Sequence, residues 1–271
     1  MLTVECVKLF GGDDVSLFYE DEKVMLLKGD SLELMKEIAD ESIDVIISDP
    51  PFFLSNGGVS VQSGNQVSVN KGDLDSAELT DPEEFYSNFI DEARRVLTKD
   101  GTIMVFGTMH NIYLVGYLLQ KKEWKILNNI TWQKTNPAPN LSGRMFTHST
   151  ENIIWARKDA KKGKHIFNYK LMKEYNGGKQ MKDVWSSATV SRKEKEFGKH
   201  PTQKPEWIME RLVEASTSVD SIILDPFVGS GTTAVAAVKH GRRVIGIDLS
   251  EEYLEIAEKR IQKAEEDINL F

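Results

Sequence analysis

Two short apolar runs, far apart in the chain, each end in an Asp-Pro pair. Val45-Ile46-Ile47 leads into Asp49-Pro50-Pro51-Phe52, and Ser221-Ile222-Ile223-Leu224 leads into Asp225-Pro226 and a glycine-rich turn. Continuous apolar runs of this length are typical of strands buried on both faces of a parallel sheet. Each motif alone is a weak signal, because an Asp-Pro-Pro can be an ordinary strand-ending turn and a glycine pair after a strand can serve many nucleotides. Together they constrain one another and favour an α/β fold.

The order of the remaining elements agrees with a circularly permuted, doubly wound sheet. Helical spacing of apolar residues is clearest at Phe85, Phe89, Ala93 and Val96. The patterns predict strands at 22–28, 43–48, 101–107, 125–133, 221–224 and 243–247, and helices at 31–39, 82–97, 110–122 and from 232 to 238.

The first motif suits chemistry on an exocyclic amine. Such an amine is a poor nucleophile because its lone pair is delocalised into the ring, so both N–H bonds need acceptors. The Asp49 carboxylate and the Pro50 carbonyl can supply them, while Pro50 and Pro51 stiffen the backbone. Phe52 offers a face on which a flipped base can stack. The alternative is a capped strand end with a phenylalanine in the core.

The second motif suits a nucleoside cofactor. Gly229 and Gly231 let the backbone approach a ligand closely, and a helix is expected from Thr232. Asp248 follows the next predicted strand, where a carboxylate can accept from both ribose hydroxyls. These features do not separate NAD from S-adenosylmethionine, although Ala234 meets the third small position of the NAD fingerprint only loosely. A phosphate-binding P-loop is excluded, since no Gly-Lys-Ser/Thr follows.

With these motifs the chain resembles the amino-methylating DNA methyltransferases, specifically the permuted (beta) group in which the catalytic motif precedes the cofactor motif. Leu26-Leu27-Lys28-Gly29-Asp30-Ser31 is similar to the family strand whose aspartate contacts the cofactor adenine, and His200-Pro201-Thr202-Gln203-Lys204-Pro205 to the segment that holds the methionine end. The resemblance implies S-adenosyl-L-methionine as cofactor and a mostly parallel, seven-stranded Rossmann-like sheet. It assigns catalysis to Asp49, Pro50, Pro51 and Phe52, and cofactor binding to Asp30, His200, Thr202, Gln203, Lys204, Asp225, Phe227, Gly229, Ser230, Gly231, Thr232 and Asp248.

Within that group the chain is similar to the DpnII-type, DpnA-like adenine methyltransferases. The matching segments are 55–58 (SNGG), 128–140 (NNITWQKTNPAPN) and 178–185 (GKQMKDVW). The resemblance implies N6 methylation of a flipped adenine in GATC, within a restriction-modification system. It also implies double-stranded DNA as partner, single-stranded DNA as a further substrate, and allows a homodimer. Phe52 stands where the family more often has tyrosine, so a hydroxyl contact is in doubt but stacking is not.

The resemblance divides the chain into three parts. Residues 1–133 form the catalytic half, 134–199 an inserted target-recognition region, and 200–271 the cofactor-binding half. Within the first part, 53–76 is rich in Gly, Ser and Asn, and either folds over the target base as a lid or is a disordered insertion. The sequence does not choose between these two.

Charge is distributed unevenly along the chain. The net charge is −8, yet 157–199 carries thirteen Lys or Arg against five Asp or Glu, which is +8 locally and leaves −16 for the remainder. A basic segment of this kind can neutralise DNA phosphates, while the acidic body keeps the protein soluble. The plainer alternative is a solvated lysine-rich surface.

The single cysteine, Cys6, narrows the class of protein further. It excludes a disulfide within the chain and a zinc site of paired cysteines, and no metal is expected. Cytosine-C5 methylation is disfavoured as well, because that reaction needs a thiolate beside a proline. The start lacks a leader pattern and no apolar run approaches the roughly twenty residues of a membrane span, so we expect a cytoplasmic enzyme.

Three alternatives remain at this stage. Cytosine-N4 methyltransferases are close rivals, but they usually place serine where this chain has Asp49. RNA or protein-glutamine methyltransferases use a related motif, against which the basic insert and the permuted order argue. A nucleic-acid-binding module without catalysis would not need Asp49, Gly229, Gly231 and Asp248 together. His148, near Ser149 and Glu151, is expected to be structural, since no Gly-x-Ser-x-Gly elbow accompanies it.

Overall fold

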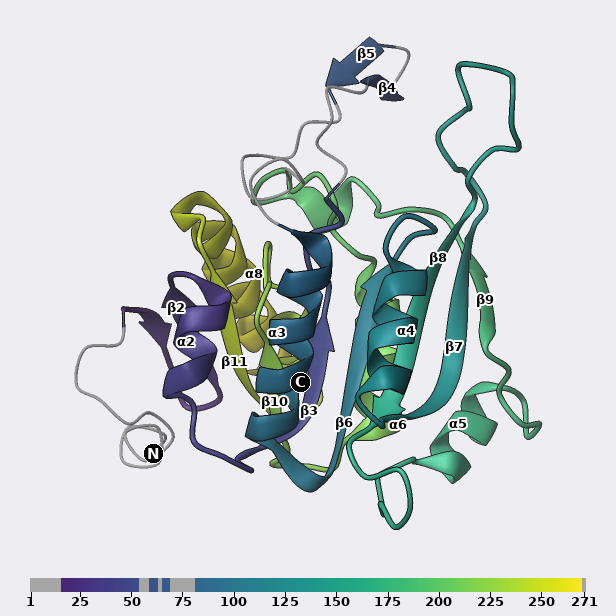
Figure 1. Cartoon of the computed structure of the whole chain (residues 1–271). Coiled ribbons are helices and arrows are strands. Elements are labelled where there is room, and N and C mark those ends of the chain that lie inside the picture. The colour runs from purple at the N-terminus through teal and green to yellow at the C-terminus, as the bar shows by residue number, and fades with distance from the viewer. Residues whose placement is uncertain (1–15, 54–58, 63–64, 69–80, 270–271) are drawn as a thin grey trace.

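The computed structural model describes residues 16–53, 59–62, 65–68 and 81–269 (Figure 1). Most of the predicted 53–76 loop lies outside these residues. The described parts of the loop include two short strands, β4 (Val59–Gln62) and β5 (Asn65–Ser68), which pair with each other in antiparallel fashion. Whether the loop covers a base stays a prediction.

One mixed sheet of nine strands forms the centre of the described chain. Its order is β1-β2-β11-β10-β3-β6-β8-β7-β9, and five of its eight neighbouring pairs are parallel. The strands are β1 (Leu17–Glu20), β2 (Val24–Lys28), β3 (Ile43–Ser48), β6 (Leu97–Gly107), β7 (Lys125–Lys134), β8 (Thr150–Arg157), β9 (Val184–Ser187), β10 (Ile222–Asp225) and β11 (Arg243–Asp248). The mostly parallel α/β fold is thus confirmed.

The strand number differs from the expected seven. The two additional strands, β1 and β9, lie at the two edges of the sheet and have four residues each. Edge strands are paired on one side only, so they do not need the continuous apolar run that marks a central strand. This is why the sequence pattern does not reveal them.

Helices cover both faces of the sheet (Figure 1). The first face carries α2 (Ser31–Glu37), α3 (Pro82–Val96) and α4 (Ile112–Lys121), and the second carries α6 (Glu206–Ser216), α7 (Thr232–Lys239) and α8 (Glu251–Asn269). Strand side chains alternate between the two cores: in β3, Ile43 and Ile46 pack on the first and Val45 and Ile47 on the second. A three-layer fold follows from this alternation.

Local sequence explains where several helices begin. Asp30 caps α2 by accepting from the Glu33 backbone N–H at 3.0 Å, and Asp81 caps α3 by accepting from that of Glu83 at 2.9 Å. Pro82 occupies the first turn of α3, where no N–H partner is needed. The predicted boundaries hold within a few residues, the largest difference being β6, which begins at Leu97 rather than at 101.

Strands β10 and β3 are neighbours although about 180 residues separate them, with Ile223 beside Val45 and Leu224 beside Ile46. The helix that follows β10 in the chain, α7, lies on the second face, whereas the next helix after β3, α3, lies on the first face. Such a reversal opens a crevice at the carboxyl ends of the two strands, where α/β proteins bind ligands. No helix in the described part of the chain is long and apolar enough to cross a membrane.

Candidate active site

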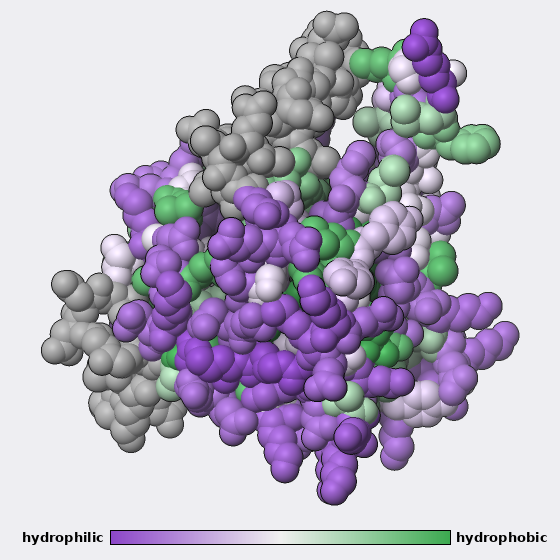
Figure 2. Space-filling model, in the orientation of Figure 1, coloured by the Kyte–Doolittle hydropathy of each residue, from purple (hydrophilic) through white to green (hydrophobic). Residues whose placement is uncertain are grey.

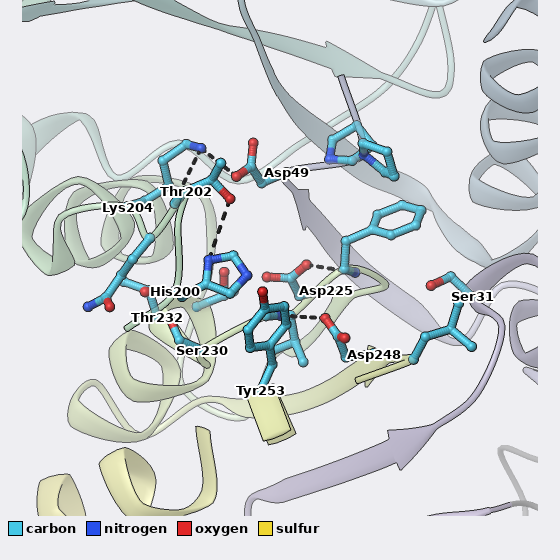
Figure 3. A pocket seen from close by; sticks show the side chains of 18 of the residues that line it. Ser31, Asp49, His200, Thr202, Lys204, Asp225, Ser230, Thr232, Asp248 and Tyr253 are labelled. Atoms are coloured by element: carbon cyan, nitrogen blue, oxygen red, sulfur yellow. Dashed lines mark hydrogen bonds and ion pairs between the residues drawn. The ribbon is translucent and has the colours of Figure 1, made fainter. Parts of the chain in front are cut away.

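A cavity of about 620 Å³ lies at the carboxyl ends of β3, β10 and β11 (Figure 3). Its volume falls within the roughly 300–1,000 Å³ of typical small-molecule sites. The catalytic motif and the glycine-rich turn both line it. Of the sixteen predicted site residues, these fifteen line the cavity: Asp30, Asp49, Pro50, Pro51, Phe52, His200, Thr202, Gln203, Lys204, Asp225, Phe227, Gly229, Ser230, Thr232 and Asp248.

The sixteenth, Gly231, lies behind the cavity wall. It has a left-handed φ of +79° and is the N-cap of α7, and a Cβ there would stand 2.7 Å from the Ala257 Cβ of α8. Gly231 therefore lets α7 begin close to α8 and shapes the turn, rather than lining the cavity. Whether Gly231 contacts the cofactor stays a prediction.

Gly229 shapes the cavity floor directly. Its φ is +51°, and a Cβ would come within 2.9 Å of the His200 Nε2. Its backbone N–H donates to Asp248 Oδ2 at 2.9 Å, which ties the turn after β10 to the end of β11. A glycine is needed here both for backbone conformation and for space, so the turn fits a ligand approaching the main chain closely.

Three carboxylates surround the middle of the cavity, with Asp225 between Asp49 and Asp248 (Figure 3). Burial raises the pKa of Asp225 to about 7, although it accepts from the Phe227 N–H at 3.1 Å. Burial also raises the pKa of Asp248. A cavity lined with desolvated acids favours a ligand that carries positive charge or hydroxyl donors.

Asp49 belongs to a cluster of four alternating charges. The Lys204 Nζ forms an ion pair with the Asp49 carboxylate and lies 3.4 Å from Glu151 Oε2, while Lys134 pairs with Glu151 Oε1. The Lys204 side chain is only 4% exposed. A buried ammonium between two carboxylates compensates both charges, which would otherwise be costly to desolvate.

The shifts in pKa within the cluster follow from these contacts. Burial alone would raise the pKa of Glu151, but Lys204 and Lys134 hold it below its ordinary value. Burial alone would lower the pKa of Lys204, but Asp49 and Glu151 raise it. Glu151 and Lys204 are therefore both charged at neutral pH.

Two members of this cluster, Glu151 and Lys134, were missed by the sequence analysis. Glu151 was noted only beside His148, which lies outside the cavity lining with its ring 6.1 Å from that of His110. A usable signal existed, because Glu151 lies in β8 only two residues before the apolar run Ile153-Ile154-Trp155-Ala156. A carboxylate entering a buried strand needs a partner.

Lys204, a predicted residue for the methionine end of the cofactor, contacts the catalytic motif in the structure. In the structure its ammonium faces Asp49 and Glu151, and it stands 5.4 Å from the centroid of the Phe52 ring. Phe52 itself is buried. Contacts of Lys204 with a cofactor stay a prediction, while its contact with the catalytic motif is a feature of the structure.

The backbone of the catalytic motif is anchored from the first helical layer. The Tyr86 hydroxyl donates to the Pro51 carbonyl, and Asn111 Nδ2 donates to the Tyr86 hydroxyl oxygen at 2.9 Å. Phe53 follows with a φ of +55°, packed edge-on against Phe85 at 5.2 Å between ring centroids. A non-glycine residue in this conformation is strained, and such strain is common at functional sites.

The basic segment 157–199 does not form one surface. Strand β8 runs antiparallel to β6. It therefore returns the chain to the opposite edge from the cavity, where the parallel strands begin (Figure 1). There Lys158 pairs with Glu41 at 3.1 Å and the Lys164 backbone N–H donates to Asp100. The first part of the segment therefore lies away from the cavity, because strand direction and not sequence position decides where it lies; phosphate binding by the rest of the segment stays a prediction.

A family model described as DNA methylase matches residues 43–259, which include both motifs and the cavity between them. This chain belongs to the DNA methylase family. Among its relatives, the Type II methyltransferase M2.LlaDCHI of Lactococcus lactis subsp. cremoris is 57% identical over 247 residues, covering 91% of this chain and 92% of the relative. The Type II methyltransferase M2.DpnII of Streptococcus pneumoniae is 54% identical over 253 residues, covering 93% and 94%.

Solved structures of other DNA methylases share the fold. The PvuII DNA methyltransferase (cytosine-N4-specific) aligns with a TM-score of 0.72 at 18% identity, covering 96% of this chain and 95% of the other. The M1.HpyAVI complex with SAM aligns with a TM-score of 0.65 at 24% identity, covering 88% and 98%. At these identities the likeness supports the methylase fold and no finer property.

Proposed function

We propose that this DNA methylase transfers a methyl group from S-adenosylmethionine to the N6 nitrogen of adenine in GATC, as the modification enzyme of a restriction-modification system. One observation carries the proposal. Asp49 at the end of β3 and the glycine turn at the end of β10 line the same cavity, because the two strands are neighbours in the sheet. An acceptor for an amine and a turn for a nucleoside thus face each other.

The cavity residues fit this cofactor. S-adenosylmethionine supplies an electrophilic methyl group on a positively charged sulfur. Gly229 leaves room for it at the main chain, the Asp248 carboxylate would accept from the ribose hydroxyls, and Asp225 would lie beside it in the middle of the cavity. Asp30 and His200 also line the cavity.

The catalytic motif holds and orients the amine. The Asp49 carboxylate and the Pro50 carbonyl accept from the two N–H bonds and bring the nitrogen towards tetrahedral geometry, while the Phe52 ring bounds the base pocket. Lys204 forms an ion pair with the Asp49 carboxylate, and Glu151 lies against the same Lys204 ammonium, which holds this group in place. No general base has to ionise the amine first, because the methylated amine loses its proton readily.

Adenine in GATC is favoured by two observations. Asp49 stands where cytosine-N4 enzymes usually carry serine, and relatives named Type II methyltransferases cover nine tenths of the chain. The DNA partner is double-stranded and, by the same resemblance, also single-stranded, and the enzyme acts in the cytoplasm. A homodimer is a further prediction, for which light scattering of the full chain is the measurement.

Transfer of a labelled methyl group to oligonucleotides tests the proposal. Matched GATC and scrambled sequences are compared as single and double strands, and the labelled nucleoside is identified. N6-methyladenine confined to GATC supports reaction and specificity together. Label on scrambled DNA contradicts the GATC specificity, N4-methylcytosine contradicts the adenine assignment, and absence of label with bound cofactor contradicts DNA as the acceptor.

A further inference from the structure

The segment 135–149, here called the finger, joins β7 to β8 and rises beyond the carboxyl edge of the sheet, the edge that holds the active site (Figure 1). Apolar side chains gather at its tip instead of packing into the body. Phe146 is 97% exposed, Met145 60% and Leu141 55%, and hydrophobic groups project from this part of the surface in Figure 2. Exposed apolar side chains gathered at one point mark an interaction site.

The finger tip is held in shape by its own hydrogen bonds. Asn140 Nδ2 donates to the Met145 carbonyl at 2.7 Å, and Asn140 Oδ1 accepts from the Ser142 backbone N–H at 3.0 Å. Gly143 supplies the left-handed φ of +60° that the turn requires. The side chains of Met145 and Phe146 are therefore presented on a formed turn.

The base of the finger is continuous with the catalytic cluster. The backbone N–H of Lys134 donates to the Ser149 carbonyl at 2.7 Å, closing the two ends of the finger. Lys134 and Glu151, which flank these ends, form the ion pair that reaches Asp49 through Lys204. Hydrogen bonds and ion pairs therefore connect the base of the finger to Asp49, so a DNA ligand could contact the finger tip and the catalytic motif together.

The charge of the finger fits a polyanion. Between 135 and 149 the chain has Arg144 and His148 and no Asp or Glu, although acidic residues outnumber basic ones in the whole chain. A second copy of this acidic chain would gain less from such a surface than nucleic acid would. The combination of apolar tip, arginine and absent carboxylates favours DNA as the occupant.

We infer that the finger opens the DNA base stack, with Phe146 entering the duplex beside the target adenine and Met145 flanking it. This inference rests on the proposed function, because a base must leave the stack before its amine can reach Asp49. Apolar side chains inserted between base steps compensate the lost stacking, and an aromatic ring does so over the largest area. Arg144 contacts the adjacent phosphates.

The test compares duplex with single-stranded GATC substrate for Phe146→Ala, Phe146→Trp and the wild type. A single strand has little stack to open, so Phe146→Ala should lower kcat/KM on the duplex by about tenfold or more, the scale of one base–aromatic stack. On the single strand it should change kcat/KM by less than about twofold, and Phe146→Trp should keep duplex activity. Tyr175→Ala is the control, since that aromatic side chain is 51% exposed on α5 (Tyr169–Tyr175), at the opposite edge of the sheet.

A second readout does not depend on methyl transfer. With 2-aminopurine at the target position, base extrusion raises fluorescence, and Phe146→Ala should lose that rise while the wild type and Tyr175→Ala keep it. If the wild type extrudes the base and Phe146→Ala does not, but no methyl is transferred, the finger inference holds and the proposed reaction is wrong. The inference would be overturned if Phe146→Ala lowered kcat/KM equally on both substrates or left kcat/KM on the duplex unchanged. It would also be overturned if the wild type acted on single strands only.

Discussion

At the scale of single residues, Lys204 is decisive, because it lies buried between Asp49 and Glu151. Lys204→Met leaves those carboxylates without their shared cation and should destabilise the fold by about 3 kcal/mol. It should also move the acid limb of the kcat profile to higher pH, since a carboxylate that loses a neighbouring cation is harder to ionise. Lys134, the fourth member of the cluster, and the neighbouring Asp225 stay unchanged in the variant.

The control for this prediction is the charge-balanced double variant Lys204→Met with Glu151→Gln. It removes one positive and one negative charge, so urea unfolding should recover a large part of the lost stability while turnover stays low. A single variant with the wild-type pH profile would show that Lys204 does not act on the charge of Asp49.

Asp225 predicts a pH-dependent stability. Its folded-state pKa of about 7 lies above the ordinary 3.8, so between these values the folded protein binds a proton that the unfolded chain has released. This group therefore destabilises the fold progressively as pH rises from about 4 to about 7. Asp225→Asn keeps an acceptor for the Phe227 N–H. At pH 8 its free energy of unfolding, measured with urea, should exceed that of the wild type by at most about 4 kcal/mol. At pH 4 the difference should nearly vanish; equal differences at both pH values would contradict the assignment.

Asp49 and Asp248 form a matched pair of aspartates with separate expected roles. Asp49→Asn should abolish turnover while calorimetry still detects cofactor binding, because the amide no longer accepts as a carboxylate does. Asp248→Ala should weaken cofactor binding by about tenfold or more through lost ribose contacts. Unchanged affinity in Asp248→Ala would remove that residue from the ribose site, and an active Asp49→Asn enzyme would contradict the mechanism.

At the scale of elements, the start of α7 depends on its close approach to α8. Gly231→Ala meets both a left-handed φ of +79° and a contact of 2.7 Å with Ala257. Gly241→Ala, in the turn after α7, meets a φ of +71° but open space, so it should cost only the backbone strain of about 1–2 kcal/mol. Gly231→Ala should cost more and weaken cofactor binding, which urea unfolding and calorimetry of both variants would measure. Equal costs would show that α7 and α8 adjust freely.

At the scale of the whole molecule, the cavity joins distant parts of the chain. Asp30 and Asp49 come from the amino-terminal part of the chain and Gly229 and Asp248 from the carboxyl-terminal part, so a bound cofactor contacts both. Cofactor at about a hundred times its Kd should stabilise the fold by about 2.7 kcal/mol and raise Tm by several degrees. Differential scanning calorimetry would check this. Asp49→Asn should keep the shift and Asp248→Ala should lose most of it, whereas equal shifts in the two variants would contradict the assigned roles.

Much of this molecule could be read from short stretches of sequence. Strands β3, β10 and β11 were predicted within one residue of their ends, because continuous apolar runs between polar turns are a local signal. Parallel strands end at one edge, so the residues that follow these three strands, Asp49, Gly229 and Asp248, line one cavity. The sequence by itself therefore determined the family, the central parallel strands and the residues at their ends that line the cavity.

Other features depended on strand order and direction, which no local pattern records. Glu151 meets Lys204, the ion-pair partner of Asp49, because β8 begins at the catalytic edge. The same antiparallel strand carries Lys158 to the opposite edge, and the finger that precedes it rises beyond the edge that holds the active site. Only the tertiary structure decided these placements, because the direction of a strand in the sheet fixes which edge its flanking residues reach, whatever their distance along the chain.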